Sequence, residues 1–171
     1  MSCAGYDFIS EMTNRCNNSS IFYTALQMKI HGEWEITLVR NVLVRTTAGS
    51  FNDEGTQACF LDTQQKAPSA MAWAGLTNAA NWEMSSATSL QAFAQMREWA
   101  FTHGCTCLAV VVPNRIRMEI HRRQTGNAPQ DLVHYFSSVE TACAWLTGRG
   151  FAFTLDDYPH QAFVDRTRPA G

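Results

Sequence analysis

Two cysteines separated by one residue, Cys105 and Cys107, stand at the start of an apolar run that is typical of a strand. Alternate residues of a strand share a face, so we expect both thiols on the same face of a sheet. Such a pair could bind a soft metal ion or form a redox couple. A closed zinc site needs four ligands, and the sequence has no second cysteine pair at a matching spacing. We therefore expect buried structural thiols and no metal site.

A pair of serines, Ser85 and Ser86, precedes the strongest helical pattern in the sequence. A phosphate at this point would meet the positive end of the helix dipole and its unpaired N–H groups. Serine is also an ordinary residue at a helix N-cap, and capping alone is the simpler interpretation. Ser85 and Ser86 are therefore candidates for a regulatory phosphorylation or anion site, with capping as the alternative.

The segment before these serines is expected to be a loop that follows a short buried strand over residues 70–76. Asn78 and Asn81 favour turns, and Trp82 is a large aromatic residue in the expected loop. Thr88 follows the serines at the start of the helix. We take Asn78, Asn81, Trp82 and Thr88 as a candidate surface for a partner or a ligand.

Two further groups of residues have both a functional and a structural interpretation. Large aromatic side chains at helix and strand spacing could line a pocket for an apolar ligand, or they could fill the core. These are Trp73, Trp82, Phe93, Trp99, Phe101, Phe136 and Trp145. The basic segment 115–124 could contact phosphates or acidic groups, or it could be a solvated helix face.

No catalytic motif is present in the sequence. The five histidines are scattered, and there is no Gly-x-Gly-x-x-Gly string, phosphate-binding loop or His-Glu-x-x-His motif. We expect no cofactor and no enzymatic activity. An unrecognised enzyme would need polar side chains that converge in one cleft.

The composition excludes several classes of protein. Only 16% of the 171 residues are charged, below the roughly 25% of soluble domains, and the net charge is −2. Disorder and nucleic-acid binding are therefore not expected. The longest apolar run, Leu108–Val112, is far shorter than a membrane span of about 20 residues. The first residues lack the features of a secretory signal, so we expect a reduced, cytoplasmic protein.

Hydrophobic periodicity predicts alternating strands and helices after an N-terminal hairpin. The hairpin joins strands over residues 34–39 and 42–47 through Arg40 and Asn41, because Asn tolerates a positive φ. The expected helices are 53–66, 86–103, 115–124 and 137–148, and the later strands are 70–76, 106–112 and 132–136. This order predicts an α/β fold with a mixed, mostly parallel sheet of four to five strands and helices packed on it.

The domain boundaries and helix starts follow from the same patterns. We expect an N-terminal extension over residues 1–27, one domain over 28–155 and a polar tail over 156–171. Capping boxes are predicted at Thr88, with Gln91, and at Ser137, with Glu140.

The element order and several strings resemble the STAS-like group, named for sulfate transporters and anti-sigma-factor antagonists. The strings are WEITLVRNVLVRTTAGSFN, MREWAFTHG, CLAVVV and HYFSSVETACAWL, and the resemblance covers about residues 28–153. It implies a small bacterial regulatory module for protein–protein interaction, without catalysis. In anti-sigma-factor antagonists, a serine in an Asp-Ser-Ser-Gly-like turn is phosphorylated and switches partner binding. Here Met84 and Ala87 replace the Asp and the Gly that flank the two serines.

The resemblance also leaves a second function open. A related set of these domains is thought to bind small apolar or lipid-like ligands. The expected partner is therefore a regulatory protein or, in the alternative, a small apolar ligand. Edge strands of such sheets can pair across a two-fold axis, so a homodimer is compatible with this fold.

Overall fold

The structure is a computed structural model that describes residues 29–124 and 131–169. The expected N-terminal extension, residues 1–27, lies outside the described residues.

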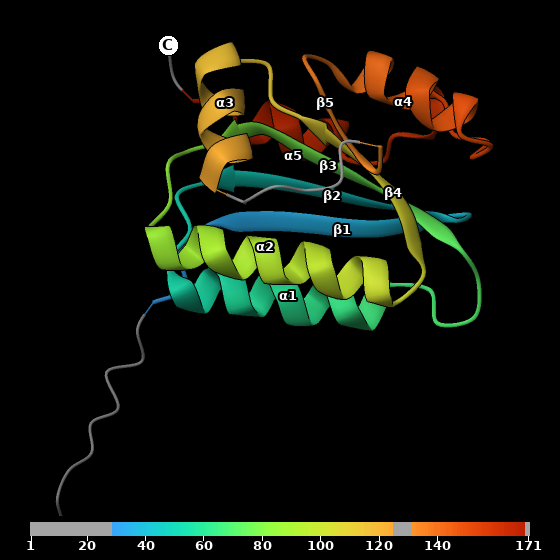
Figure 1. Cartoon of the computed structure of the whole chain (residues 1–171). Coiled ribbons are helices and arrows are strands. Elements are labelled where there is room, and N and C mark those ends of the chain that lie inside the picture. Colours follow the sequence, from blue (N-terminus) through green and yellow to red (C-terminus); the bar gives the residue numbers. More distant parts are fainter. Residues whose placement is uncertain (1–28, 125–130, 170–171) are drawn as a thin grey trace, which may run out of the picture.

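Five strands form one sheet in the order β1-β2-β3-β4-β5 (Figure 1). β1 and β2 are antiparallel, and each later strand is parallel to the one before it. The strands are β1 (Glu33–Val39), β2 (Val42–Gly49), β3 (Trp73–Trp82), β4 (Cys105–Val111) and β5 (Val133–Phe136). The predicted mixed, mostly parallel sheet with an N-terminal hairpin is confirmed.

Helices follow the strands in the predicted alternation. They are α1 (Asp53–Lys66), α2 (Ala87–Thr102), α3 (Arg115–Gln124), α4 (Val139–Gly148), the 3-10 turn η1 (Leu155–Asp157) and α5 (Gln161–Arg166). Within the described ranges, no helix combines the length and the apolar character needed to cross a membrane.

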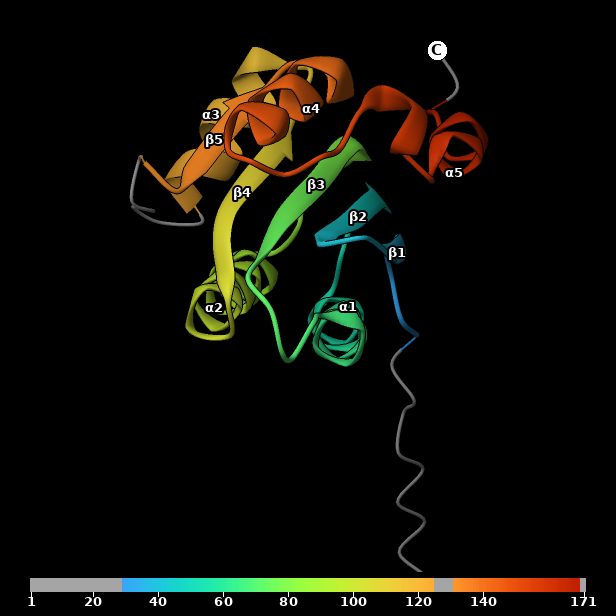
Figure 2. The ribbon, with the colours of Figure 1, turned by 90° about the vertical axis from the view of Figure 1, so that its right-hand side faces the viewer.

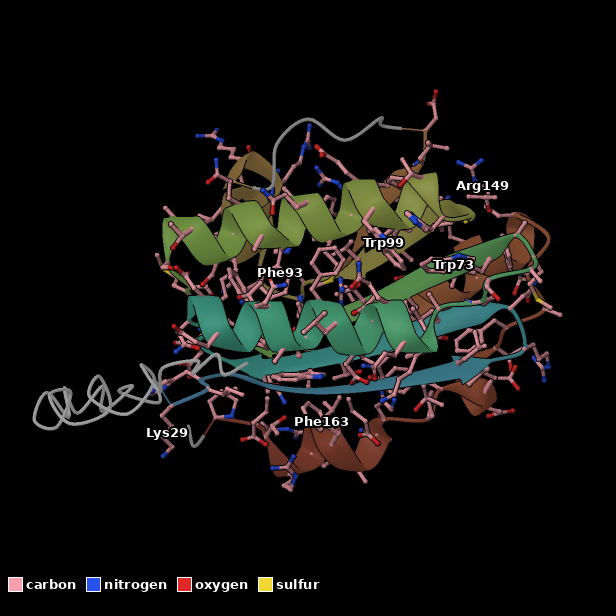
Figure 3. The ribbon with its side chains drawn as sticks, turned by 90° about the horizontal axis from the view of Figure 1, so that it is seen from below. Lys29, Trp73, Phe93, Trp99, Arg149 and Phe163 are labelled. Carbon is pink, nitrogen blue, oxygen red and sulfur yellow. The ribbon has the colours of Figure 1, made fainter. Side chains whose placement is uncertain are left out.

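The sheet is covered on both faces, as Figure 2 shows, with α1 and α2 on one side and α4 and α5 on the other. Each face of the sheet has its own hydrophobic core, and successive side chains of β2 point into the two cores in turn. Leu43 packs toward α1 and α2, while Val42 and Val44 pack toward α4. The two facing helices contact through Trp99 of α2, whose ring lies 5.8 Å from that of Phe60 in α1. Phe93 of α2 lies 5.3 Å from Phe51, which precedes α1. Figure 3 shows Phe93 and Trp99 where α2 faces α1.

The tight turn between β1 and β2 differs from the prediction in one detail. Arg40, not Asn41, takes the left-handed conformation, with φ of 54°. Its guanidinium binds both carboxylate oxygens of Asp157, at 2.7 and 3.0 Å, and the carbonyl oxygen of Ala152. These contacts hold Arg40 in a conformation that costs a non-glycine residue about 1–2 kcal/mol. The same hydrogen bonds lower the pKa of Asp157 to about 2.

β3 extends to Trp82, so the prediction of a loop after residue 76 was wrong. Asn78 and Asn81 lie inside the strand and are buried. The Asn78 side-chain amide donates to Tyr158 Oη at 2.8 Å, and that of Asn81 donates to the Val164 carbonyl at 2.7 Å. These tertiary hydrogen bonds satisfy amides that local propensity assigns to turns.

The C-terminal residues differ from the polar tail expected for residues 156–171. Tyr158, His160 and Phe163 are buried against the sheet. His160 hydrogen-bonds through Nδ1 to Thr46 Oγ1 and through Nε2 to Thr37 Oγ1, each at 2.9 Å. The described part of the segment after residue 155 is therefore packed into the same fold as the strands.

Cys105 and Cys107 lie on opposite faces of the sheet, so their predicted common face was wrong. Cys105 pairs with Trp73 and Cys107 with Ala74, which leaves Thr106 as the extra residue of a bulge. Cys105 therefore packs toward α1 and α2, and Cys107 packs toward α4. Burial raises the pKa of Cys105 to about 12. Among residues 29–124 and 131–169, no three His, Cys, Asp or Glu side chains could hold a metal ion.

Two helix starts also differ from the predicted capping boxes. Ser86 caps α2 and accepts from the Ser89 N–H, and Ser138 caps α4 and accepts from the Thr141 N–H. The predicted cap residues, Thr88 and Ser137, lie two residues after and one residue before the observed caps.

Candidate functional site

The first turns of α1 and α2 meet at one carboxylate. Asp53 Oδ1 accepts hydrogen bonds from the hydroxyls of Ser86, Thr88 and Ser89, at 3.1, 2.7 and 3.0 Å. The bond from Thr88, followed by that from Ser89, holds the pKa of Asp53 below its usual value. A charged carboxylate therefore fixes the start of α2 against the start of α1.

Ser86 has a structural role in this network. It is exposed, and its Oγ accepts from the Ser89 N–H at 3.1 Å while its hydroxyl faces Asp53. A phosphate on Ser86 would place two negative groups side by side and remove a hydrogen bond to the carboxylate. Phosphorylation of Ser86 would thus work against the contact between the helices.

Ser85 also has hydrogen-bond partners inside the fold. Its Oγ accepts from the Phe51 N–H and from Trp82 Nε1, each at 3.1 Å. The hydroxyl thereby joins the end of β3 to the segment between β2 and α1. Both predicted serines lie at the start of α2, and both connect neighbouring elements.

The residues of the candidate surface proposed from the sequence do not lie together on one surface. Asn78, Asn81 and Trp82 are buried, with exposed fractions of 2%, 8% and 3%, whereas Thr88 is exposed. Trp82 contacts α3, since its ring lies 5.6 Å from that of His121 and its carbonyl oxygen accepts from Arg117 Nη1 at 3.1 Å. Of the four residues, Thr88 is available at the surface.

Two exposed apolar residues, one just after β3 and one in the first turn of α3, were missed by the sequence reasoning. Met84 is 63% exposed and lies between the buried end of β3 and Ser86. Ile116 is 73% exposed in the first turn of α3, next to the arginine that contacts Trp82. We call Met84, Ser86, Thr88 and Ile116 the α2–α3 surface. Figure 1 shows the starts of α1 and α2 and the helix α3 on the same side of the molecule.

No sequence signal distinguishes Met84 or Ile116 from core residues. Both are large and apolar, and Ile116 lies in a helix whose neighbouring Met118 is partly buried. Exposure of a single apolar residue is set by which helix face contacts the sheet, and this depends on the tertiary packing.

Comparisons with known proteins identify the fold. No family model matches the sequence, and neither does any curated protein. An uncharacterised protein of the DUF3478 family from Shewanella loihica PV-4, with a SpoIIAA-like fold, has a TM-score of 0.51 at 13% identity. The match covers 69% of this chain and 95% of that protein. The chain therefore has the SpoIIAA-like fold, as the STAS-like resemblance predicted, and at this identity the likeness concerns the fold alone.

Two anti-sigma factor antagonists are also similar in structure. One, from Mycobacterium paratuberculosis, has a TM-score of 0.47 at 13% identity and covers 68% of this chain and 95% of its own. The other, SpoIIAA in its unphosphorylated form, has a TM-score of 0.45 at 14% identity and covers 70% of this chain and 100% of its own.

Proposed function

We propose that the protein is a non-enzymatic regulatory module that binds a partner protein through the α2–α3 surface. The observation that carries the proposal is the exposure of Met84, which precedes the polar network at the start of α2, and of Ile116 on α3, where Arg117 contacts the end of β3. Exposed apolar residues rimmed by polar groups are typical of protein interaction sites. The STAS-like resemblance supports the same class of function.

The charges around Ile116 indicate the chemistry of the partner. The exposed arginines of α3 are Arg115, Arg122 and Arg123. Arg123 forms an ion pair with Glu119, with 2.8 Å between Nε and Oε1. A partner surface with an apolar centre and carboxylates at its edge would complement this arrangement.

The apolar-ligand alternative has less support. Two cavities beneath α2 measure about 40 and 30 Å³, and both include arginine in their lining. Pockets for organic ligands usually measure about 300–1,000 Å³. A hollow of 630 Å³ between the end of α1 and the end of α2 lies open on the surface, bordered by exposed Met71 and by Trp99. The aromatic side chains thus mainly fill the core, which is one of the two interpretations that their spacing permits.

Native mass spectrometry of protein isolated gently from its own source tests the proposal. The wild type should carry a stoichiometric protein partner, and Met84→Glu and Ile116→Glu should each lose it, since a carboxylate at an apolar contact is costly to desolvate. Leu155→Glu is the matched control, because Leu155 is 50% exposed on η1, away from the α2–α3 surface.

Loss of the partner only from the first two variants would support the α2–α3 surface. A partner that stays bound to both of them would place the interface elsewhere. If the wild type carries no protein partner, the proposed function is wrong.

A further inference from the structure

Arg45 is a half-buried cation that has no carboxylate partner among residues 29–124 and 131–169. It extends from β2 beneath α2, where Nη2 donates to Thr77 Oγ1 at 3.0 Å and Nη1 contacts Met96 Sδ. Its Nε is buried and has no hydrogen-bond partner, and it is alone in this among the side-chain nitrogen and oxygen atoms of the described residues. A guanidinium in this state leaves a strong donor unsatisfied.

The groups around Arg45 do not compensate its charge. Burial lowers its pKa, and the groups that oppose this shift are the thiols of Cys59 and Cys105. Burial in turn raises the pKa of Cys59 to about 11 and that of Cys105 to about 12. Both thiols are therefore neutral near pH 7, and the positive charge of Arg45 stays unbalanced.

A cavity of about 40 Å³ opens beside Arg45, between the sheet, α2 and α3. Polar groups from four elements line it together with Arg45. They are Thr77, Arg97, His121 and Tyr135. None of the described residues that line it is acidic. The cavity therefore concentrates positive charge and hydroxyl groups in a partly enclosed space.

The size of the cavity limits what it can hold. A water molecule needs a cavity of roughly 10–15 Å³. A cavity of about 40 Å³ therefore accommodates about three waters or one small ion. A second cavity of about 30 Å³ shares Arg45, Thr77 and Arg97 with the first and lies beside it.

We propose that this cavity binds a small oxyanion beside the Arg45 guanidinium. An oxyanion would compensate the charge of Arg45, and its oxygens match the plane of the guanidinium. Phosphate, sulfate and a small carboxylate share this chemistry. The site is distinct from the α2–α3 surface and does not depend on the proposed partner.

The test compares anions at constant ionic strength, with chloride as the reference. Isothermal titration calorimetry of the full chain with inorganic phosphate, sulfate and acetate gives the affinity of each. Arg45→Met removes the guanidinium and keeps an unbranched side chain of similar length. Arg115→Met is the matched control, since Arg115 is exposed on α3.

We expect the wild type to bind at least one of the three anions, and Arg45→Met to weaken that binding by about tenfold or more. Arg115→Met should bind as the wild type does. Acetate binding alone would assign a carboxylate ligand, and binding of phosphate or sulfate would assign a tetrahedral one.

Thermal unfolding separates loss of the site from loss of the fold. Removal of a buried charge is often neutral or stabilising, so Arg45→Met should melt cooperatively without added anion. The wild type should melt at a higher temperature in a solution of the anion that it binds than in chloride. Arg45→Met should melt at the same temperature in both solutions. Equal responses in the two proteins, or no anion-specific effect in the wild type, would overturn the proposal.

Discussion

At the residue scale, two adjacent serines before α4 show how one hydrogen bond sets the start of a helix. Ser138 Oγ accepts from the Thr141 N–H at 3.3 Å, whereas Ser137 is exposed and precedes the cap. Ser138→Ala should lower the free energy of unfolding by about 1 kcal/mol, and Ser137→Ala should leave it nearly unchanged. Urea unfolding of both variants measures the difference. If both variants lose the same free energy of unfolding, Ser138 is not the cap of α4.

His121 predicts a dependence of stability on pH. Burial, followed by the charges of Arg45 and Arg97, lowers its pKa to about 4, so the imidazole is neutral in the folded protein. The unfolded chain takes up a proton near pH 6.5, and stability is therefore complete above that pH and falls toward pH 4. We expect a loss of about 2 kcal/mol between pH 7.5 and pH 5 from this group.

Urea unfolding at the two pH values tests this expectation, with His121→Phe as the comparison. Burial also lowers the pKa of His160, so the variant should keep a smaller loss on acidification. If acidification destabilises the variant as much as the wild type, His121 does not titrate on unfolding.

At the element scale, period and propensity predicted the order of strands and helices but not the end of β3. Local patterns describe neighbours within a few residues, whereas Asn78 and Asn81 owe their place in the strand to partners more than 75 residues away. The same limit explains Cys105 and Cys107, since the bulge at Thr106 is visible only in the pairing with β3. Strand alternation alone could not reveal it.

Tyr158 connects the C-terminal segment to β2 and β3. Its hydroxyl hydrogen-bonds to Thr46 Oγ1 at 2.7 Å and accepts from Asn78 Nδ2 at 2.8 Å. Tyr158→Phe leaves the buried Asn78 amide without this partner, so the free energy of unfolding should fall by about 1–3 kcal/mol. Gln161→Ala, at an exposed position on α5, is the control and should change little. A Tyr158→Phe protein as stable as the control would mean that the Tyr158 hydroxyl adds nothing to the stability of the fold.

At the scale of the whole molecule, Trp82 links the two proposed sites. It lines the cavity beside Arg45, its Nε1 donates to Ser85, and its carbonyl accepts from Arg117 on α3. The sequence indicated Ser85 and Ser86 as a phosphorylation or anion site, and Trp82 as part of a separate candidate surface. It could not indicate the cavity, since Arg45, Arg97 and His121 come from three separate elements and meet only in the folded chain.

The central claim is that a partner protein binds the α2–α3 surface, and hydrogen–deuterium exchange of the isolated complex tests it directly. We predict that the partner slows exchange of backbone amides over residues 83–88 and 115–120. Amides over residues 155–166, on the other face of the sheet, should exchange at the same rate with and without the partner. Protection confined to 155–166, with none over 83–88 and 115–120, would contradict the claim.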